Sequence, residues 1–176
     1  GDPCIPLGTV TIQEVKAPEG YLLNDKIYTC EIKDDGGKIE SVYTYNVPEV
    51  GSEEAVSEQV KRGDLKIVKV KDGTMQRLSN IKFKITSKTT GESHIVCTDE
   101  NGIIDTSSDW NSHKDDTNGG SAESGVWFGE IGAIDDSKGA LLYDYYTIDE
   151  IRGENNEGLK LLKNVEFRIY RDSTVL

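Results

Sequence analysis

The chain has 176 residues and a formal net charge of −12, from 32 acidic and 20 basic side chains. This balance excludes nucleic acid as an expected partner, because binding to phosphates needs clusters of Lys and Arg. No apolar run approaches the ~20 residues of a membrane-spanning helix, so we expect no insertion into a membrane. The length suits one ordinary domain or two small ones, and the frequent Val, Ile, Thr and Tyr favour β-structure.

The cysteines give no sign of a metal site. Cys4, Cys30 and Cys97 stand in no CxxC or Cys/His spacing, so we predict no bound metal there. Three independent residues are the simplest interpretation, with Cys97 a small strand or core residue. A Cys4–Cys30 disulfide is the alternative. Neither His94 nor His113 has a sequence context that marks a catalytic base.

The first strand expected along the chain covers residues 7–16 and ends in a turn. Val10 and Ile12 alternate with polar residues, and the same period of two places Glu14 on their side of the sheet. If that side faces a core, the carboxylate must be paired, protonated or used, because burying an unpaired charge is costly. Pro and Gly at positions 18 and 20 predict the turn. Further strands are expected at 26–33 and 39–47.

Residues 49–62 are polar and poor in strand formers, which predicts a linker. A second and larger β-unit is expected over 63–176. The stretch 105–125 within it has almost no strand formers and is predicted to be a long inserted loop, a feature that is often functional in a small β-domain. Around this loop we expect a short apolar run at 126–131 and strands at 64–72, 78–88, 93–99, 143–151 and 163–172.

Alternation in this second unit places two charged residues on apolar strand faces. Glu150 follows Tyr146 and Ile148 on one face, and Lys69 follows two aliphatic residues on another. The opposite face of the lysine strand carries two valines and is the alternative core face. A lysine and a glutamate in one core form either a simple buried ion pair or a reactive pair. In the second interpretation, burial favours a neutral, nucleophilic amine and a protonated glutamate that shuttles protons.

The two parts of the chain contain related segments. TIQEVKAPEGYLL at 11–23 aligns with TIDEIRGENNEGLKL at 147–161. Each has a strand, an inward glutamate, a glycine-containing turn and a further strand. The chain is therefore predicted to hold offset copies of one repeat.

Two sets of segments carry a resemblance to a known family. TVTIQEVKAPEGYLLND with YNVP downstream, and GDLKIVKVKDG followed by NIKFKI, resemble the end and the start of Cna B-type (SpaA-like, prealbumin-fold) repeats of Gram-positive surface adhesins and pilins. The resemblance implies an all-β, prealbumin-like (immunoglobulin-like) β-sandwich. It also implies an isopeptide bond between a lysine and an Asn or Asp, assisted by a glutamate and needing no cofactor. Matched residue by residue, the proton shuttles are Glu14 in the first repeat and Glu150 in the second, the nucleophile is Lys69, and the acyl partner of the first repeat is Asn46.

The sequence also departs from the pattern of that family. IRGENNEG follows Glu150 in place of APxGY. We expect residues 1–48 to be the C-terminal part of a first repeat, and residues 63–176 to be a second repeat that lacks its last strand. The lysine of the first repeat would then lie before Gly1, and the acyl partner of the second would lie after Leu176. A bond between Lys69 and Asn46 would consequently join two repeats.

The resemblance implies a structural role. We expect a stalk or repeat domain of an extracellular protein, anchored to the cell wall through other parts of its parent, with neighbouring repeats as its partners. The sequence contains no catalytic triad, metal motif or phosphate loop, so we expect no enzyme activity. The alternative is a binding module for a host protein or glycan, in which Trp110 of the 105–125 loop contacts the ligand, since Trp127 beside Phe128 is expected in the core. The Asp and Asn residues of the same loop are a candidate for Ca²⁺ binding, although they do not follow the EF-hand order.

Overall fold

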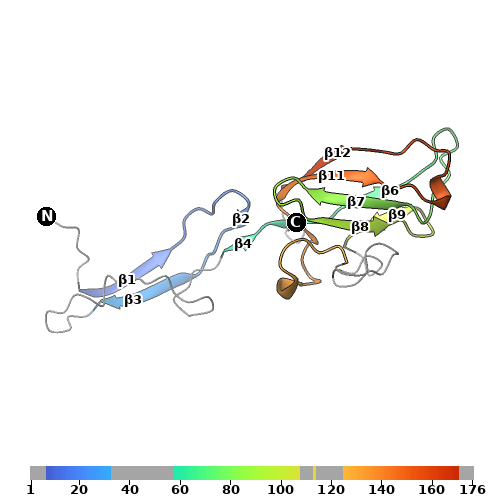
Figure 1. Ribbon diagram of the computed structural model, residues 1–176. Helices are drawn as coiled ribbons and strands as arrows, with labels where there is room; N and C mark the ends of the chain where they lie inside the picture. Colours follow the sequence, from blue (N-terminus) through green and yellow to red (C-terminus); the bar gives the residue numbers. More distant parts are fainter. Residues whose placement is uncertain (1–6, 33–57, 108–112, 114–124, 171–176) are drawn as a thin grey trace. The chain divides into compact units, whose positions relative to one another are not determined.

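The computed structural model describes residues 7–32, 58–107, 113 and 125–170. The chain divides into two compact units, Gly1–Gln59 and Val60–Leu176, which are described separately. Regular structure in the described parts consists of β-strands and short 3-10 turns (Figure 1), and it includes no helix long and apolar enough to cross a membrane. The predicted all-β fold is therefore confirmed.

The first unit contains a two-stranded antiparallel ribbon, formed by β1 (Gly8–Gln13) and β3 (Ile27–Ile32). The turn predicted after β1 is present. The backbone N–H of Tyr21 donates to the carbonyl of Pro18 at 3.1 Å, and Gly20 takes a φ of +91°. Glycine reaches this left-handed region without steric cost, so the chain can reverse direction here. The short strand β2 (Tyr21–Leu22) follows this turn, and the short strand β4 (Gln59–Val60) falls at the boundary between the two units in the sequence.

The second unit is built on a four-stranded antiparallel sheet (Figure 1). Along its strand β11, residues Tyr146, Ile148 and Glu150 are buried, while the residues between them are more exposed. The predicted period of two is therefore confirmed for this strand. In spatial order the sheet consists of β12 (Val165–Ile169), β11 (Asp144–Glu150), β7 (Lys82–Ser87) and β8 (Ser93–Cys97).

A second layer of shorter strands packs on this sheet. It consists of two antiparallel pairs, β6 (Lys66–Val68) with β9 (Ile103–Asp105), and β5 (Arg62–Gly63) with β10 (Leu141–Leu142). The 3-10 turns η2 (Ile131–Ala133) and η3 (Glu154–Asn156) lie in connecting loops. Side chains from both layers form one core, which includes Ile81, Phe83, Ile85, Val96, Ile104, Phe128, Leu141, Tyr146 and Ile148.

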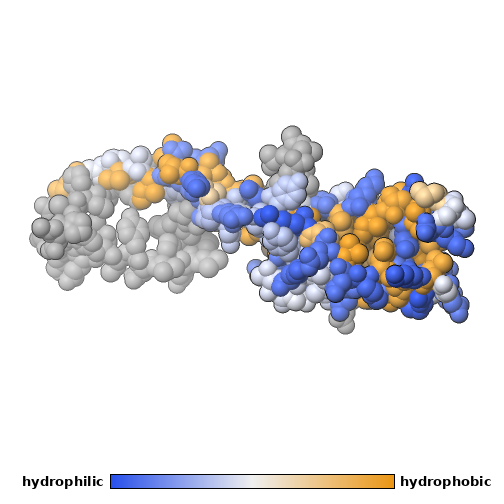
Figure 2. Space-filling view, turned by 90° about the horizontal axis from the view of Figure 1, so that it is seen from above, coloured by the Kyte–Doolittle hydropathy of each residue, from blue (hydrophilic) through white to orange (hydrophobic). Residues whose placement is uncertain are grey.

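The face of β6 that turns toward this core is the predicted one. Leu65 and Ile67 are partly buried against the core cluster, whereas Lys66 and Val68 are exposed. Figure 2 shows that the described surface of the second unit is not uniformly hydrophilic, because apolar side chains also reach it. Among the described residues of this unit, the exposed large apolar ones are Val68, Met75, Tyr145, Leu162, Val165 and Tyr170.

The strand predicted at 78–88 begins only at Lys82. Before it, the Thr98 hydroxyl accepts a hydrogen bond from the N–H of Ile81 at 2.9 Å and donates to the carbonyl of Leu78 at 2.8 Å. The N–H of Asn80 donates to the carbonyl of Thr98 at 3.0 Å. A buried side chain thus takes the place of regular ladder bonds, which the strand pattern alone does not indicate.

The end of the predicted linker belongs to the folded second unit. Arg62 is 8% exposed, and its guanidinium donates to the carbonyls of Phe128 at 2.8 Å and Gly139 at 3.2 Å. It also lies 3.6 Å from the ring centroid of Trp127, a cation–π contact. The predicted burial of Trp127 and Phe128 is confirmed, and their segment is irregular.

Candidate functional site

The structure brings Lys69 and Glu150 together in the second unit. Lys69 directly follows β6, and Glu150 is the last residue of β11. Lys69 Nζ donates to Glu150 Oε2 at 3.1 Å. The Glu150 side chain is fully buried and that of Lys69 is 12% exposed. The two residues that alternation selected from the sequence therefore form a buried ion pair.

Lys69 is fixed by the turn that precedes β9. Its N–H donates to the carbonyl of Gly102 at 2.8 Å, and its carbonyl accepts from the N–H of Leu78 at 3.0 Å. Gly102 has a φ of +71°, and a Cβ atom added there would lie 2.9 Å from the Lys69 carbonyl oxygen. The turn can approach the lysine backbone this closely because residue 102 carries no side chain.

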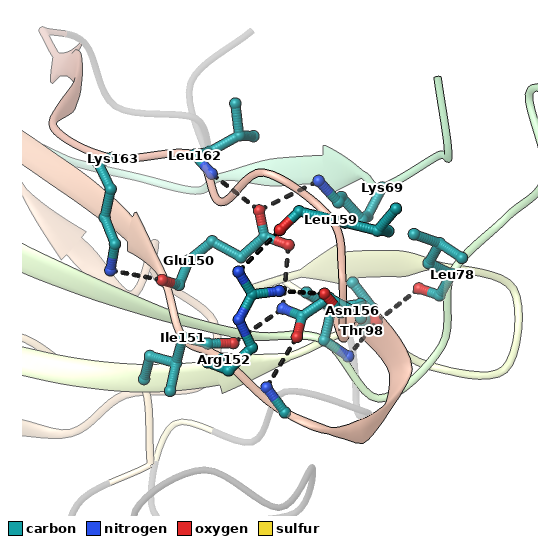
Figure 3. A network of polar contacts seen from close by, with 12 residues as sticks. Lys69, Leu78, Thr98, Glu150, Ile151, Arg152, Asn156, Leu159, Leu162 and Lys163 are labelled. Atoms are coloured by element: carbon teal, nitrogen blue, oxygen red, sulfur yellow. Dashed lines mark hydrogen bonds and ion pairs between the residues drawn. The ribbon is translucent and has the colours of Figure 1, made fainter. Parts of the chain in front are cut away.

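Three donors surround the Glu150 carboxylate (Figure 3). Oε2 accepts from Lys69 Nζ and from the N–H of Leu162 at 3.0 Å, and Oε1 accepts from Asn156 Nδ2 at 3.1 Å. Burial raises the pKa of the Glu150 carboxyl, but the hydrogen bonds from Leu162, Asn156 and Lys69 outweigh it and hold the pKa below its ordinary value. The lowered pKa favours the charged form of Glu150, as in the simple ion pair that is one of the two interpretations of the sequence. The role of Glu150 as a proton shuttle stays a prediction.

The backbone around Glu150 is held as firmly as its side chain. Its N–H donates to the carbonyl of Leu162 at 2.9 Å, which pairs residues 150 and 162 in both directions. Its carbonyl accepts from Lys163 Nζ at 2.7 Å (Figure 3). A second lysine thus lies close to the site, but it contacts the main chain and not the carboxylate.

The matching glutamate of the first unit has a different environment. Glu14 is only partly buried, and Ile12 on the same strand face is 50% exposed, so the described residues do not enclose this carboxylate in an apolar core. Glu14 Oε2 accepts a hydrogen bond from the N–H of Asn24 at 2.7 Å. Glu14 is therefore paired with a backbone donor, one of the outcomes that its position predicts.

Several predicted residues lie outside the described parts of the chain. Asn46 and Trp110 are among them, so their roles as acyl partner and ligand contact stay predictions. Cys4 also lies outside them, and the Cys4–Cys30 disulfide stays a prediction. Cys97 is a buried thiol on β8, as expected, with Sγ 3.2 Å from Asn80 Oδ1.

Asn156 and Arg62 are the residues that the sequence analysis did not find. Asn156 is 1% exposed and sits in an irregular loop, where no periodicity predicts an inward side chain. A usable signal was the polar pair Asn155–Asn156, in the loop that aligns with the Pro- and Gly-containing turn of the first repeat. Arg62 carried no signal, because it closes a polar stretch.

No metal site is found in the part of the chain that the structure describes, where no three His, Cys, Asp or Glu residues group together. Most of the 105–125 loop lies outside that part, so the Ca²⁺ alternative stays a prediction. Both histidines are buried. His94 Nε2 lies 2.9 Å from Glu92 Oε1, and His113 Nε2 lies 3.0 Å from the carbonyl of Thr106.

Comparisons with known proteins agree with this architecture. Residues 3–47 match the model of a family described as SpaA, prealbumin-like fold domain. A solved structure, titled "The Bacillus anthracis TIE protein", is similar over 96% of this chain and 23% of its own, with 20% sequence identity and a TM-score of 0.54. Such a likeness shows the fold alone. A search of curated proteins gave no match. The resemblance to prealbumin-like repeats is thus confirmed for residues 3–47, and the chain as a whole is similar in fold to part of the TIE protein.

Proposed function

We propose that this chain is a structural segment from the stalk of an extracellular bacterial surface protein, and that an amide bond at Lys69 stiffens its second unit. The observation that supports this best is the 3.1 Å contact between Lys69 Nζ and the fully buried Glu150 carboxylate. The match of residues 3–47 to a prealbumin-like family supports the repeat architecture. The proposal assigns neighbouring repeats as partners, places the anchor to the cell wall elsewhere in the parent, and includes no catalytic turnover.

The geometry suits amide formation because Glu150 can accept the proton that Lys69 must lose. Moving one proton across this contact converts the ion pair into a neutral amine and a neutral acid, with no change in the total charge of the buried site. The amine then attacks the side-chain carbonyl carbon of an Asn or Asp. The Nζ–C bond forms and the C–N or C–O bond breaks. Glu150 gives its proton to the leaving group and accepts the second proton that Nζ loses, so that ammonia or water leaves. The family resemblance implies Asn46 as the acyl partner of the first repeat, whereas the partner of Lys69 would lie near the end of the last strand of the second repeat.

The bond would stabilise the unit much as a disulfide does. A covalent link between distant positions reduces the conformational freedom of the unfolded chain. Unlike a disulfide, it is not lost under reducing conditions. Such a link suits a stalk that must keep its shape outside the cell.

The intact mass of the repeat in its natural sequence context tests this proposal. We expect the wild-type protein to be lighter than its sequence mass by one ammonia, or by one water if the acyl partner is Asp. Lys69→Ala should have the full sequence mass. Lys163→Ala is the matched control, because Lys163 contacts only the Glu150 carbonyl and should leave the mass loss unchanged. A full sequence mass in the wild type, or the same loss in Lys69→Ala, contradicts the proposal.

A further inference from the structure

Asn156 donates a hydrogen bond to Oε1 of Glu150, the carboxylate oxygen that Lys69 does not contact. Lys69 Nζ donates to Oε2 at 3.1 Å, while Asn156 Nδ2 donates to Oε1 at 3.1 Å (Figure 3). Asn156 therefore fixes one oxygen of the carboxylate, Oε1, while the other oxygen, Oε2, faces Lys69. Rotation of the carboxylate away from Lys69 would break the bond to Asn156 and leave a buried donor unpaired, which is costly.

Asn156 is itself held by its own loop. Its Oδ1 accepts from the N–H of Gly153 at 2.7 Å, and its Nδ2 also donates to the carbonyl of Ile151 at 2.9 Å. The Arg152 guanidinium donates to the main-chain carbonyl of Asn156 and, at 2.7 Å, to that of Leu159. The amide is 1% exposed and uses both N–H groups and its oxygen. Its orientation is thus determined by the backbone, and it can hold another group in place.

The hydrogen bond from Asn156 adds to an arrangement of the glutamate that the two units share. In both, the glutamate accepts a backbone N–H from further along the chain, at a separation of 10 residues for Glu14 and 12 for Glu150. The segment between Glu14 and Asn24 contains no asparagine. The loop after Glu150 is two residues longer and places Asn156 in the core. Only the longer loop supplies a side-chain donor to the carboxylate.

We propose that Asn156 is a positioning residue, which holds Glu150 Oε1 so that Oε2 stays directed at Lys69 Nζ and ready to take its proton. This role rests on the proposed amide bond at Lys69. The other charged groups near Glu150 bond to other atoms than Oε1. Lys69 donates to Oε2, and Lys163 donates to the main-chain carbonyl. Arg152 is bonded to the carbonyls of the loop.

Two asparagines in one loop give the test a matched pair. Asn156→Ala removes the donor to Oε1, whereas Asn155→Ala removes only a bond from Asn155 Nδ2 to the carbonyl of Ser79. The carboxyl signal of Glu150 is followed by NMR as a function of pH. We expect Asn156→Ala to raise the titration midpoint by about one pH unit, since one hydrogen bond to the charged form is lost. Asn155→Ala should leave it unchanged.

Asn156→Asp is the second variant, because it keeps the size of the side chain. It places a second carboxyl group against Oε1 and should raise the Glu150 midpoint further than alanine does. Both variants at 156, but not Asn155→Ala, should also slow the loss of ammonia in the natural sequence context.

Two outcomes separate this inference from the function on which it rests. Equal losses of stability in Asn155→Ala and Asn156→Ala, with the Glu150 midpoint unmoved in all variants, would overturn the positioning role. A raised midpoint in the Asn156 variants, with no ammonia lost even from the wild type, would support the hold on Glu150 and reject the amide bond at Lys69.

Discussion

Glu150 makes the free energy of unfolding of the second unit depend on pH. Its pKa in the folded protein lies below the ordinary value, because hydrogen bonds from Leu162, Asn156 and Lys69 outweigh the effect of burial. A lowered pKa contributes stability that is complete above the unfolded value, roughly 4.3, and is lost as the pH falls through the folded value. Asp144 acts in the same direction, because hydroxyl donors on Ser87 and Thr89 overcome its burial and lower its pKa.

We therefore expect the free energy of unfolding to fall as the pH is lowered below the unfolded value of these carboxyl groups, roughly 4. Glu150→Gln should be less stable at neutral pH and should show a shallower pH dependence, since it has no proton to gain. Urea unfolding at a series of pH values measures both. An unchanged pH slope in Glu150→Gln would show that this carboxyl does not carry the acid sensitivity.

Arg62 is the second single residue on which much of this unit depends. Its guanidinium binds three main-chain carbonyls, those of Phe128, Gly139 and Ala140, and stacks on Trp127. Loss of the guanidinium removes the donor to the carbonyls of Phe128 and Gly139, at about 1–3 kcal/mol each, while the carbonyl of Ala140 keeps its bond from the N–H of Phe128.

Arg62→Ala should lower the free energy of unfolding by about 3 kcal/mol or more. Arg168→Ala is the control, because this guanidinium lies 5.2 Å and 4.8 Å from the ring centroids of Tyr143 and Tyr145 at the surface and should cost about 1 kcal/mol or less. Chemical denaturation measures both variants. Similar costs for the two arginines would contradict the role assigned to Arg62.

At the scale of elements, the turn before β9 is what places Lys69. Gly102→Ala meets two obstacles, a φ of +71° and a contact of 2.9 Å with the Lys69 carbonyl oxygen. Gly91→Ala meets only the first, since its φ is +76° and nothing lies within 4 Å of the added Cβ. We expect Gly91→Ala to cost about 1 kcal/mol and Gly102→Ala at least twice that. Thermal unfolding of the two variants measures these costs. Equal costs would mean that the turn tolerates a Cβ atom against the Lys69 carbonyl oxygen.

Elements with regular periodicity were predictable from the sequence. The alternation of Tyr146, Ile148 and Glu150 predicted the buried face of β11, and that of the lysine strand predicted its inward face. A period of two is a geometric property of a strand, so it does not depend on which strands pair with it. The ion pair followed from placing both residues in one core.

The rest depends on contacts between irregular segments, which no local pattern encodes. Asn156 reaches Glu150 only because a 3-10 turn folds the loop back, and Arg62 enters the core only because Trp127 and three carbonyls are there to receive it. Thr98 similarly replaces ladder bonds before β7. Side-chain hydrogen bonds of this kind compete with regular structure and are invisible in hydrophobic periodicity.

At the scale of the molecule, the two units use one local device in two forms. A glutamate at the end of a strand accepts a backbone N–H from further along the chain, across a tight turn in the first unit and across a longer loop in the second. The device closes the turn onto the strand in each case. In the second unit, Lys69 and Asn156 donate to the glutamate as well.

The separation of Lys69 and Glu150 along the chain has a structural consequence. The two residues are 81 positions apart in sequence and 3.1 Å apart in space. The ion pair therefore closes the segment between these two positions into a loop. An insertion within 105–125 should consequently leave the contact between Lys69 and Glu150 in place, because β6 and β11 lie outside the inserted residues.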